Sequence, residues 1–417
     1  MNERLLQYIW QFQQYNKGSL ATIENESLQI IHPGQLNSNQ GPDFLDAKIR
    51  IGQTTWAGSI ELHIRSSDWK LHRHDADTNY NNVILHVVWE HDVELRLPFP
   101  TLILNDRVPK VLLDKFDELM KGPEFIPCEK SIHRIDNLSI RAIIDRMLVE
   151  RMEKRSQLFL DSLEKNSSHW EESFWWLLAK HFGAQINAEE FEKIAMSLPL
   201  NILSRHKTQL IQLEALLFGQ ARLLEKKFSE SYPKMLQKEY RFLKKKYGLI
   251  QPAATLFFLR MRPQNFPTVR LAQLAKLIHE SIHLFSTIKT ARSVTEVKKL
   301  LNVTANDYWN YHFTFDEPSK YRRKALGIHM NNTILINVVI PVLFAYGSYH
   351  KDETLKEKAM KWLSGLNGET NSVTHGFKRL GLPNKSAFES QAYLQLKHEY
   401  CDKKRCLDCT IGNKILK

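Results

Sequence analysis

The chain has few cysteines and no long apolar run. These two features argue against a disulfide-stabilised secreted protein and against a membrane protein. Only four of its 417 residues are cysteine, too few for a disulfide framework, which favours a reducing compartment. The longest apolar run, residues 333–347, is too short to span a bilayer and favours a buried helix or helix pair. No apolar core of a signal peptide follows Met1. These patterns predict a cytoplasmic protein with no membrane-spanning segment.

Acidic residues are also in deficit. The chain has 46 Asp and Glu against 58 Lys and Arg, and the resulting net charge of +12 suits an anionic partner such as nucleic acid. The hydrophobic share of 43% is ordinary for a soluble globular protein, and the length is sufficient for two domains. Charge therefore makes nucleic acid the expected partner, whereas the sequence identifies no protein partner.

The first 130 residues have the hydrophobic patterns of an α/β domain. Apolar side chains recur at helical spacing near the N-terminus, and alternating apolar and polar residues follow at the spacing of strands. The run 83–89 is apolar on both faces, as in a central strand. The expected elements are helices at 3–15 and 109–120, and strands at 19–31, 44–51, 56–65, 83–89, 92–96 and 101–104.

From about residue 131 onward, amphipathic helical patterns replace the strand patterns. We therefore predict an α/β domain over residues 1–130 and a mostly α-helical domain over residues 131–417, which ends in a cysteine triplet. The segments with the clearest helical spacing are 141–158, 172–182, 202–224, 232–243, 271–285 and 353–363.

Acids and histidines are concentrated between residues 41 and 92. Five of the 17 histidines fall within residues 63–91. A strand has a period of two, so Glu61 and His63 project side by side, with Asp43 at the start of the preceding strand. A divalent ion at a phosphodiester needs such oxygen ligands and a neighbouring group that positions water. We therefore expect Asp43, Glu61 and His63 to be catalytic, with Mg²⁺ or Mn²⁺ on Asp43 and Glu61.

A second candidate group follows in the sequence His72-x-His74-x-x-Asp77, with His86 in the next strand. Imidazoles two residues apart and a nearby carboxylate are suitable ligands for zinc or a similar ion. These four residues are expected to complete the pocket of Asp43 and Glu61 or to hold a separate ion. The alternative interpretation is a solvated, histidine-rich loop and a core histidine at position 86.

The pairs Pro42-Asp43 and Glu61-Leu62-His63 resemble the motif of the PD-(D/E)xK nuclease superfamily. The core of that superfamily is a helix, a sheet, a Pro-Asp pair and a Glu-x-Lys on the following strand. Over residues 1–105 the resemblance implies a restriction-endonuclease-like mixed sheet, hydrolysis of nucleic acid, and Glu3 as an additional acid. The sequence departs from the motif at His63, where the superfamily usually has lysine.

All four cysteines are candidates for one metal site. Cys401, Cys406 and Cys409 lie within nine residues and include a CxxC pair, and Cys128 follows Pro127. Closely spaced thiolates of this kind bind zinc or an iron–sulfur cluster. We therefore expect Zn²⁺ or a [4Fe–4S] cluster on Cys128, Cys401, Cys406 and Cys409, against the alternative of free cysteines in a reducing cytosol.

A proline-punctuated basic loop lies between residues 260 and 270. Arg260, Arg262 and Arg270 are its arginines, and guanidinium groups in a loop are suited to bind phosphates. We expect these three residues to bind the phosphate backbone, against the alternative of structural salt bridges.

Over its whole length the sequence resembles DUF2851, a bacterial family without an established activity. The matching segments include Gly41-Pro42-Asp43-Phe44, Glu61-Leu62-His63, the loop 262–267 and the terminal cysteines. The function we predict is that of a metal-dependent nuclease. The alternatives are an inert nucleic-acid-binding or scaffold protein and a zinc hydrolase with another substrate.

Overall fold

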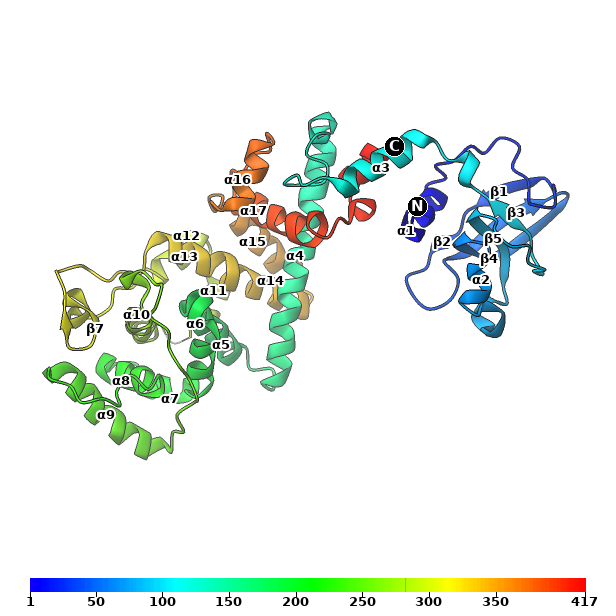
Figure 1. Ribbon diagram of the computed structural model, residues 1–417. Helices are drawn as coiled ribbons and strands as arrows, with labels where there is room; N and C mark the ends of the chain where they lie inside the picture. Colours follow the sequence, from blue (N-terminus) through cyan, green and yellow to red (C-terminus); the bar gives the residue numbers. More distant parts are fainter. Residues whose placement is uncertain (282) are drawn as a thin grey trace. The chain divides into compact units, whose positions relative to one another are not determined.

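The computed structural model describes residues 1–281 and 283–417, which form two compact units. Figure 1 traces both along the chain. The first unit comprises Met1–Arg146, His375–Leu382 and Tyr393–Lys417, and the second comprises Met147–Thr374 and Pro383–Ala392. The sequence assigned the C-terminal segment to the helical domain, whereas here it packs in the first unit. Its last helix, Thr410–Leu416, packs against Lys110–Lys121 and buries Ile411 and Leu416 there.

A mixed sheet forms the centre of the first unit. Its strand order is β1-β3-β4-β5-β6, and β2 pairs with β3. The pairs β1–β3 and β3–β4 are antiparallel, whereas β4–β5 and β5–β6 are parallel. The strands are β1 (Leu28–His32), β2 (Gln35–Leu36), β3 (Phe44–Ile51), β4 (Thr54–Arg65), β5 (Val83–Glu90) and β6 (Thr101–Ile103).

The predicted alternation is confirmed in β3, where Ala47 and Ile49 are buried and Lys48 and Arg50 are exposed. Two predicted strands are wrong in whole or in part. Residues 92–96 form no strand, because the Asp92 carboxylate accepts hydrogen bonds from Ser66 and Ser67 and holds the chain in a turn. Residues 19–31, expected as a strand pair or one long strand, form a turn at Asn25 with an antiparallel bridge between Ala21 and Ser27, and β1 follows it.

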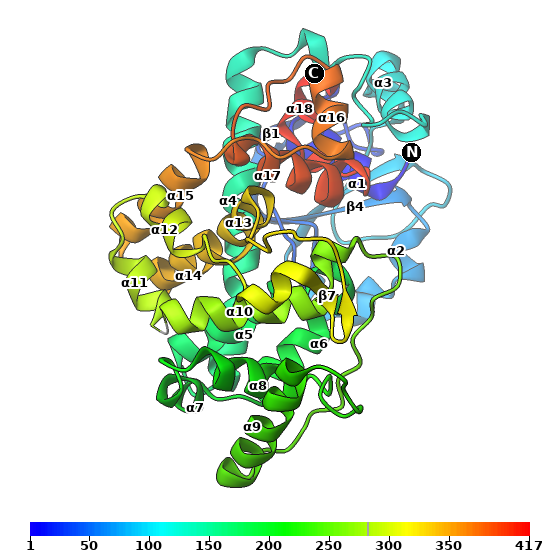
Figure 2. The ribbon, with the colours of Figure 1, turned by 90° about the vertical axis from the view of Figure 1, so that its left-hand side faces the viewer.

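Helix α1 (Glu3–Gln11) covers the sheet with its buried side chains, among them Leu5, Ile9 and Trp10. It ends earlier than predicted because Gln13 has a left-handed φ of 49°. The first unit also contains α2 (Asp68–Leu71), α3 (Lys110–Lys121), α18 (Thr410–Leu416), the start of α4 (Asn137–Lys165) and most of α16 (Ser372–Arg379), with the short turns η1 (His74–Ala76), η2 (Thr78–Tyr80), η3 (Asn105–Arg107), η4 (Ile132–Arg134), η8 (Leu396–Cys401) and η9 (Cys406–Asp408). Figures 1 and 2 both place α18 beside α3.

The remainder of the chain is mostly helical, as predicted. The expected helix 202–224 is two helices, because the chain turns at His206. Among the described residues of the second unit, β7 (His312–Thr314) and β8 (Glu317–Pro318) pair as a small antiparallel hairpin. The helices are α4 (Asn137–Lys165), α5 (Trp170–Phe182), α6 (Ala184–Met196), α7 (Leu200–Arg205), α8 (Leu210–Gln220), α9 (Ser231–Tyr247), α10 (Pro267–Glu280), α11 (Leu284–Thr290), α12 (Val294–Leu300), α13 (Ile328–Ile334), α14 (Ile340–Tyr349), α15 (Glu353–Ser364), α16 (Ser372–Arg379) and α17 (Ala387–Gln395).

The apolar run 333–347 lies in a longer helix than expected. α13, a π-helical turn at Leu335–Val339 and α14 are continuous, and together they span Ile328–Tyr349. Among the described residues this is the one helix long and apolar enough to cross a membrane, and 67% of its most apolar window is buried inside the protein. Burial of this extent is ordinary for a core helix, as the sequence predicted.

Candidate functional site

Three histidines from two segments of the first unit converge. His63 lies on β4, His72 directly follows α2, and His74 is the first residue of η1. Between the two loop histidines, Arg73 has a left-handed φ of 58°, and this turn directs both of them toward His63. His63 Nε2 lies 3.2 Å from His72 Nδ1 and 3.3 Å from His74 Nε2. Ligand atoms around a tetrahedral zinc ion are about 3.4 Å apart, so the spacing of these nitrogens suits a metal ion.

A carboxylate joins this three-histidine group. Glu61 Oε1 lies 3.5 Å from His63 Nε2 and 3.4 Å from His74 Nε2. The other oxygen of Glu61 accepts a hydrogen bond of 2.9 Å from the backbone N–H of Asp43. The Asp43 carboxylate in turn accepts from the backbone N–H of Leu62, at 3.1 Å, and from the Gln7 side chain of α1, at 2.8 Å. The backbone N–H groups of Asp43 and Leu62 and the side chain of Gln7 therefore fix both carboxylates.

The electrostatics of the site favour a bound cation. Burial raises the pKa of Glu61, and the charges of Asp43 and Glu3 raise it further. Burial likewise raises the pKa of Asp43, with Glu3 as the next cause. For His63, burial and the neighbouring histidines lower the pKa to about 2. A metal ion would reverse the two carboxyl shifts because it stabilises the carboxylate anions, and it would bind the neutral imidazole that the lowered pKa of His63 already favours.

His86 lies behind His63, outside the three-histidine group. It is fully buried on β5, where it pairs in register with Glu61, and its Nε2 lies 2.9 Å from His63 Nδ1. Burial lowers the pKa of His86 to about 4. The sequence predicted a direct ligand, but the parallel pairing of β5 with β4 places His86 where it can orient the His63 ring.

Asp77 is also placed apart from the predicted ligand group. Its carboxylate accepts hydrogen bonds from the backbone and side-chain N–H groups of Asn79, both at 2.9 Å, and caps η2. The expected role of Asp77 as a ligand is therefore replaced by a local structural one.

The arginine loop belongs to the second unit. Arg260 and Arg262 are exposed, whereas Arg270 is held by Gln273 at 2.9 Å and Asn265 at 2.6 Å. Burial lowers the pKa of Arg270 to about 10. Arg270 therefore holds its own loop in place, and phosphate binding stays a prediction for Arg260 and Arg262.

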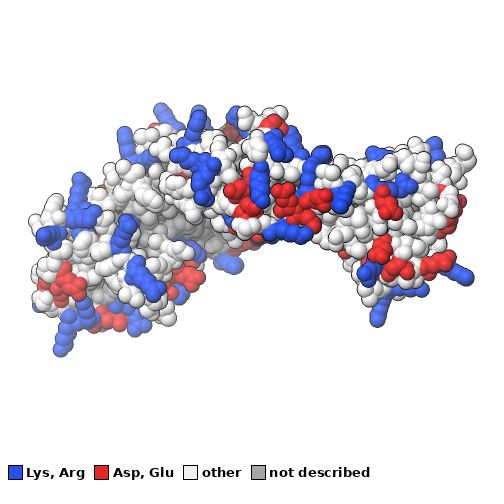
Figure 3. Space-filling view, turned by 45° about the horizontal axis from the view of Figure 1, so that its top comes forward, with Lys and Arg blue, Asp and Glu red and all other residues white. Residues whose placement is uncertain are grey.

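On the visible face of the second unit, Lys and Arg are interspersed with Asp and Glu, without one continuous positive surface (Figure 3).

The four cysteines of the predicted metal site all belong to the first unit, whereas among the described residues the group close enough to share one ion consists of His63, His72 and His74. Cys128, Cys406 and Cys409 are buried, Cys401 is partly buried, and all four thiols are free of disulfides. Each thiol lies close enough to its neighbours to affect their pKa values. This group is separate in sequence and in ligand type from the histidines.

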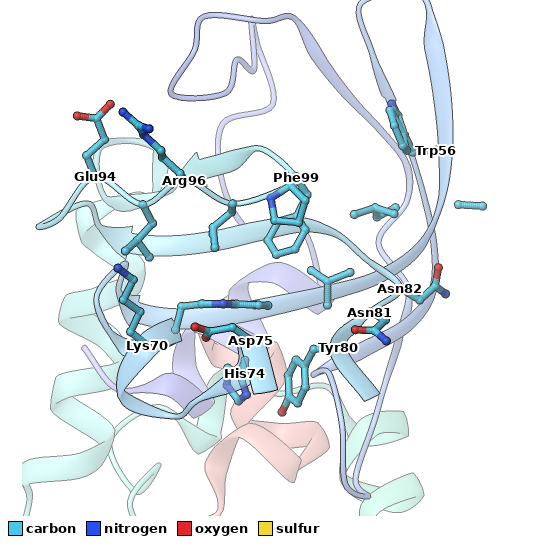
Figure 4. A pocket seen from close by; sticks show the side chains of 17 residues that line it. Trp56, Lys70, His74, Asp75, Tyr80, Asn81, Asn82, Glu94, Arg96 and Phe99 are labelled. Carbon is cyan, nitrogen blue, oxygen red and sulfur yellow. The ribbon is translucent and has the colours of Figure 1, made fainter. Parts of the chain in front are cut away.

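An aromatic cavity adjoins the three-histidine group and was not predicted. Its volume is about 940 Å³, and His74 is one of its lining residues. Figure 4 shows His74 beside Tyr80, with which its ring stacks at 3.9 Å, and Trp56 on the far side of the cavity from Lys70. Trp56 is 49% exposed although it lies on a strand. Sequence alone could not distinguish it from a core tryptophan.

Comparison with known proteins identifies a family and no relative of known activity. Residues 3–372 match the family described as "Protein of unknown function (DUF2851)". This match includes the histidines and carboxylates of the site and ends before the terminal cysteines. No curated protein and no solved structure matches the chain significantly. Since the match covers most of its length, the chain belongs to the DUF2851 family.

Proposed function

We propose that this protein hydrolyses phosphodiester bonds of nucleic acid with the help of a divalent metal ion held in the first unit. The observation that carries the proposal is the convergence of the three histidines with Glu61, whose other oxygen accepts a hydrogen bond from the backbone N–H of Asp43. Phosphodiester hydrolysis depends on positioned groups and on neutralisation of phosphate charge more than on covalent chemistry. Glu61 and the three histidines would hold the divalent ion that supplies this charge neutralisation.

The chain's own residues would divide the work as follows. Glu61, His63 and both loop histidines would hold the ion, and Asp43 would contribute a second carboxylate. The ion would lower the pKa of a bound water and neutralise phosphate charge. His86 would fix the ring of His63, which favours His63 as a ligand over the water-activating role expected from the sequence. Gln7 would orient Asp43 through its 2.8 Å hydrogen bond.

The resemblance to the PD-(D/E)xK superfamily supports this proposal, because the helix, the Pro-Asp pair and the strand with the Glu-x-His motif follow one another in the same order along the chain. Helix α1 comes first, Pro42-Asp43 precedes β3, and Glu61-Leu62-His63 lies on β4, which pairs with β3. The charge of Glu3 on α1 acts on both Asp43 and Glu61, as the additional acid of the resemblance would. His63 stands where the superfamily usually has lysine. An imidazole at this position could bind the metal ion directly, which a lysine ammonium group cannot do.

The aromatic cavity supports a substrate with exposed rings. Trp56, Tyr80 and Phe99 line it, and its charged lining residues are the cations Lys70 and Arg96 and the anions Asp75 and Glu94 (Figure 4). Bases of single strands stack on aromatic side chains with little dependence on sequence. We therefore propose single-stranded nucleic acid, or a base drawn out of a duplex, as the substrate.

The test is an assay of the full chain on single- and double-stranded DNA and RNA, after chelation and with Mg²⁺, Mn²⁺ or Zn²⁺ restored. We expect cleavage with at least one ion and its arrest by chelator. Absence of cleavage of all four substrates with all three ions would overturn the proposal. Salt-dependent binding without cleavage, retained when Asp43 and Glu61 are both replaced by Ala, would instead identify an inert binding protein.

A zinc hydrolase of another substrate is the second candidate, and the ligand types favour it. Three imidazole nitrogens beside one carboxylate oxygen form a zinc-type ligand set, whereas Mg²⁺ prefers oxygen ligands throughout. Stoichiometric zinc together with hydrolysis of small esters or peptides, and no cleavage of nucleic acid, would select this function.

Removal of the exposed indole should weaken substrate binding. We expect Trp56→Ala to raise KM for single-stranded substrate by about 5- to 100-fold and leave kcat within about twofold, because stacking acts in the ground state and the transition state alike. Trp56→Phe should retain most of the affinity. Leu36→Ala, an exposed apolar residue on β2, is the matched control. Equal KM values for all three variants would exclude the cavity as the substrate site.

A further inference from the structure

Two segments of the second unit meet beside helix α10. One is the loop of residues 258–266, which leads into α10, and the other is the segment of residues 319–324, which follows the hairpin of β7 and β8. Figures 1 and 2 both place β7 beside α10. The side chain of Gln264 reaches the guanidinium of Arg322, so the two segments touch directly.

The backbone of the second segment is held in place by hydrogen bonds. The Gln273 amide of α10 donates to the Lys324 carbonyl at 3.1 Å, and both groups are buried. The backbone N–H of Arg322 donates to the Asn310 carbonyl at 2.7 Å. Side chains on this segment are therefore presented from a fixed backbone.

Five exposed cations lie on the two segments. They are Arg260, Arg262, Lys320, Arg322 and Arg323. Within the described part of the chain, none of the five forms an ion pair with a carboxylate. The acids that precede the second segment have other partners, because Asp316 accepts hydrogen bonds from the backbone N–H groups of Ser229 and Glu230. Glu317 accepts one from the Thr314 hydroxyl. The five cations are therefore available to an external anion.

Two exposed tyrosines lie among these cations. Tyr311 is 53% exposed and Tyr321 is 63% exposed, and their ring centroids are 5.3 Å apart with an interplanar angle of 61°. Tyr321 stands between Lys320 and Arg322 in the sequence. Exposed rings among basic side chains are typical of surfaces that bind single strands, because bases stack on the rings and phosphates pair with the basic groups.

We propose that this basic–aromatic surface, formed by the five cations with Tyr311 and Tyr321, binds single-stranded nucleic acid. The guanidinium groups hold phosphates of the backbone, and the two rings stack on bases. The surface belongs to the second unit, whereas the candidate catalytic site belongs to the first. Binding here therefore does not depend on the proposed hydrolysis.

The composition of the surface favours nucleic acid over an anionic membrane. Four of the five cations are arginine, whose planar group donates two parallel hydrogen bonds to one phosphate. An anionic membrane surface attracts Lys and Arg alike through charge and requires no such fork.

The test is fluorescence anisotropy of the full chain with labelled oligo-dT and oligo-U at several salt concentrations, with chelator present so that cleavage does not interfere. Arg260→Ala/Arg262→Ala and Arg322→Ala/Arg323→Ala should each weaken binding at least about tenfold. Each pair should also reduce the slope of log affinity against log salt by about 1.4, because two phosphate contacts are lost. The replaced side chains are exposed, so the unfolding temperature should stay within about 2 °C of wild type.

The matched control is Lys238→Ala/Lys245→Ala, which removes the same charge from exposed positions of α9. It should change the affinity by less than about twofold, because these side chains make no phosphate contact. Equal weakening by the control and by the arginine pairs would reduce the effect to net charge and overturn the proposed surface.

The tyrosines are tested apart from the charge. Tyr311→Ala/Tyr321→Ala should weaken binding by about 5- to 100-fold with an unchanged salt slope, because stacking is lost and no charge is removed. Tyr311→Phe/Tyr321→Phe should retain most of the affinity, since the ring is kept. Alanine and phenylalanine pairs that both bind like wild type would exclude base stacking at this surface.

The remaining measurements separate this surface from other sites and other partners. Binding that Trp56→Ala abolishes and the arginine pairs leave unchanged would place the nucleic acid in the first unit and overturn the proposal. Binding to phosphatidylserine vesicles, with neither oligonucleotide bound, would assign the cations to a membrane and overturn it as well. Asp43→Asn/Glu61→Gln should stop hydrolysis and retain full binding here, so failure of the proposed function and failure of this surface are distinguishable.

Discussion

Glu61→Gln should abolish hydrolysis, with a loss of at least about a thousandfold in kcat/KM, equal to about 4 kcal/mol of transition-state stabilisation. Gln has the size of Glu but no charge, so the metal loses its anionic ligand. An amide N–H2 would also face the nitrogens of His63 and His74, now 3.5 and 3.4 Å from the carboxylate oxygen. Initial rates on the best substrate, with metal affinity by calorimetry, measure both effects.

The matched control is Glu90→Gln at the end of β5. Glu90 is an exposed carboxylate of the same sheet, 3.9 Å from the exposed Arg65, and such pairs contribute little. Its replacement should change the rate by less than about twofold. Glu61→Gln protein with more than about a tenth of wild-type activity and unaltered metal affinity would remove Glu61 from the metal site.

Local periodicity predicted the part of the site that lies on single strands. The period of two predicted Glu61 and His63 together on one strand, here β4, and Asp43 lies directly before β3. Pairing of β3 with β4 then brings Asp43 and Glu61 within hydrogen-bond distance. These relations follow from strand geometry. Because that geometry depends on residues close together in the chain, it can be predicted from the sequence.

Long-range packing decided the rest, and sequence carries little signal for it. The positions of His86 behind His63 and of Asp77 on Asn79 depend on strand pairing and on a local cap. The left-handed Arg73, which turns the two loop histidines toward the site, has no side-chain signature that sequence reading could use. The C-terminal segment joined the first unit through contacts hundreds of residues apart, which no periodicity records.

The metal-free protein should lose stability as the pH rises from about 7 to about 9, by on the order of 2 kcal/mol. Burial raises the pKa of Glu61 and of Asp43, so the folded protein holds these protons more tightly than the unfolded chain. Above the unfolded pKa of about 4, stability therefore falls with rising pH until the folded pKa is passed. Urea unfolding of chelator-treated protein measures the change.

The histidines of the site have the opposite effect on folding stability, and they act at lower pH. The pKa of His63 is lowered to about 2 and that of His86 to about 4, so their contribution is lost as pH falls below about 6.5. Above about pH 7 only the carboxyl contribution changes within the site.

Variants and metal separate the carboxyl effect from the general charge of the protein. The Asp43→Asn/Glu61→Gln pair should remove the loss of stability above neutral pH, whereas Glu90→Gln should retain it. Saturation with metal should also remove it, because the cation stabilises the anions in the folded state alone. If the double variant and wild type had the same pH dependence, these carboxyls would not carry raised pKa values, and the electrostatic case for a cation site would fail.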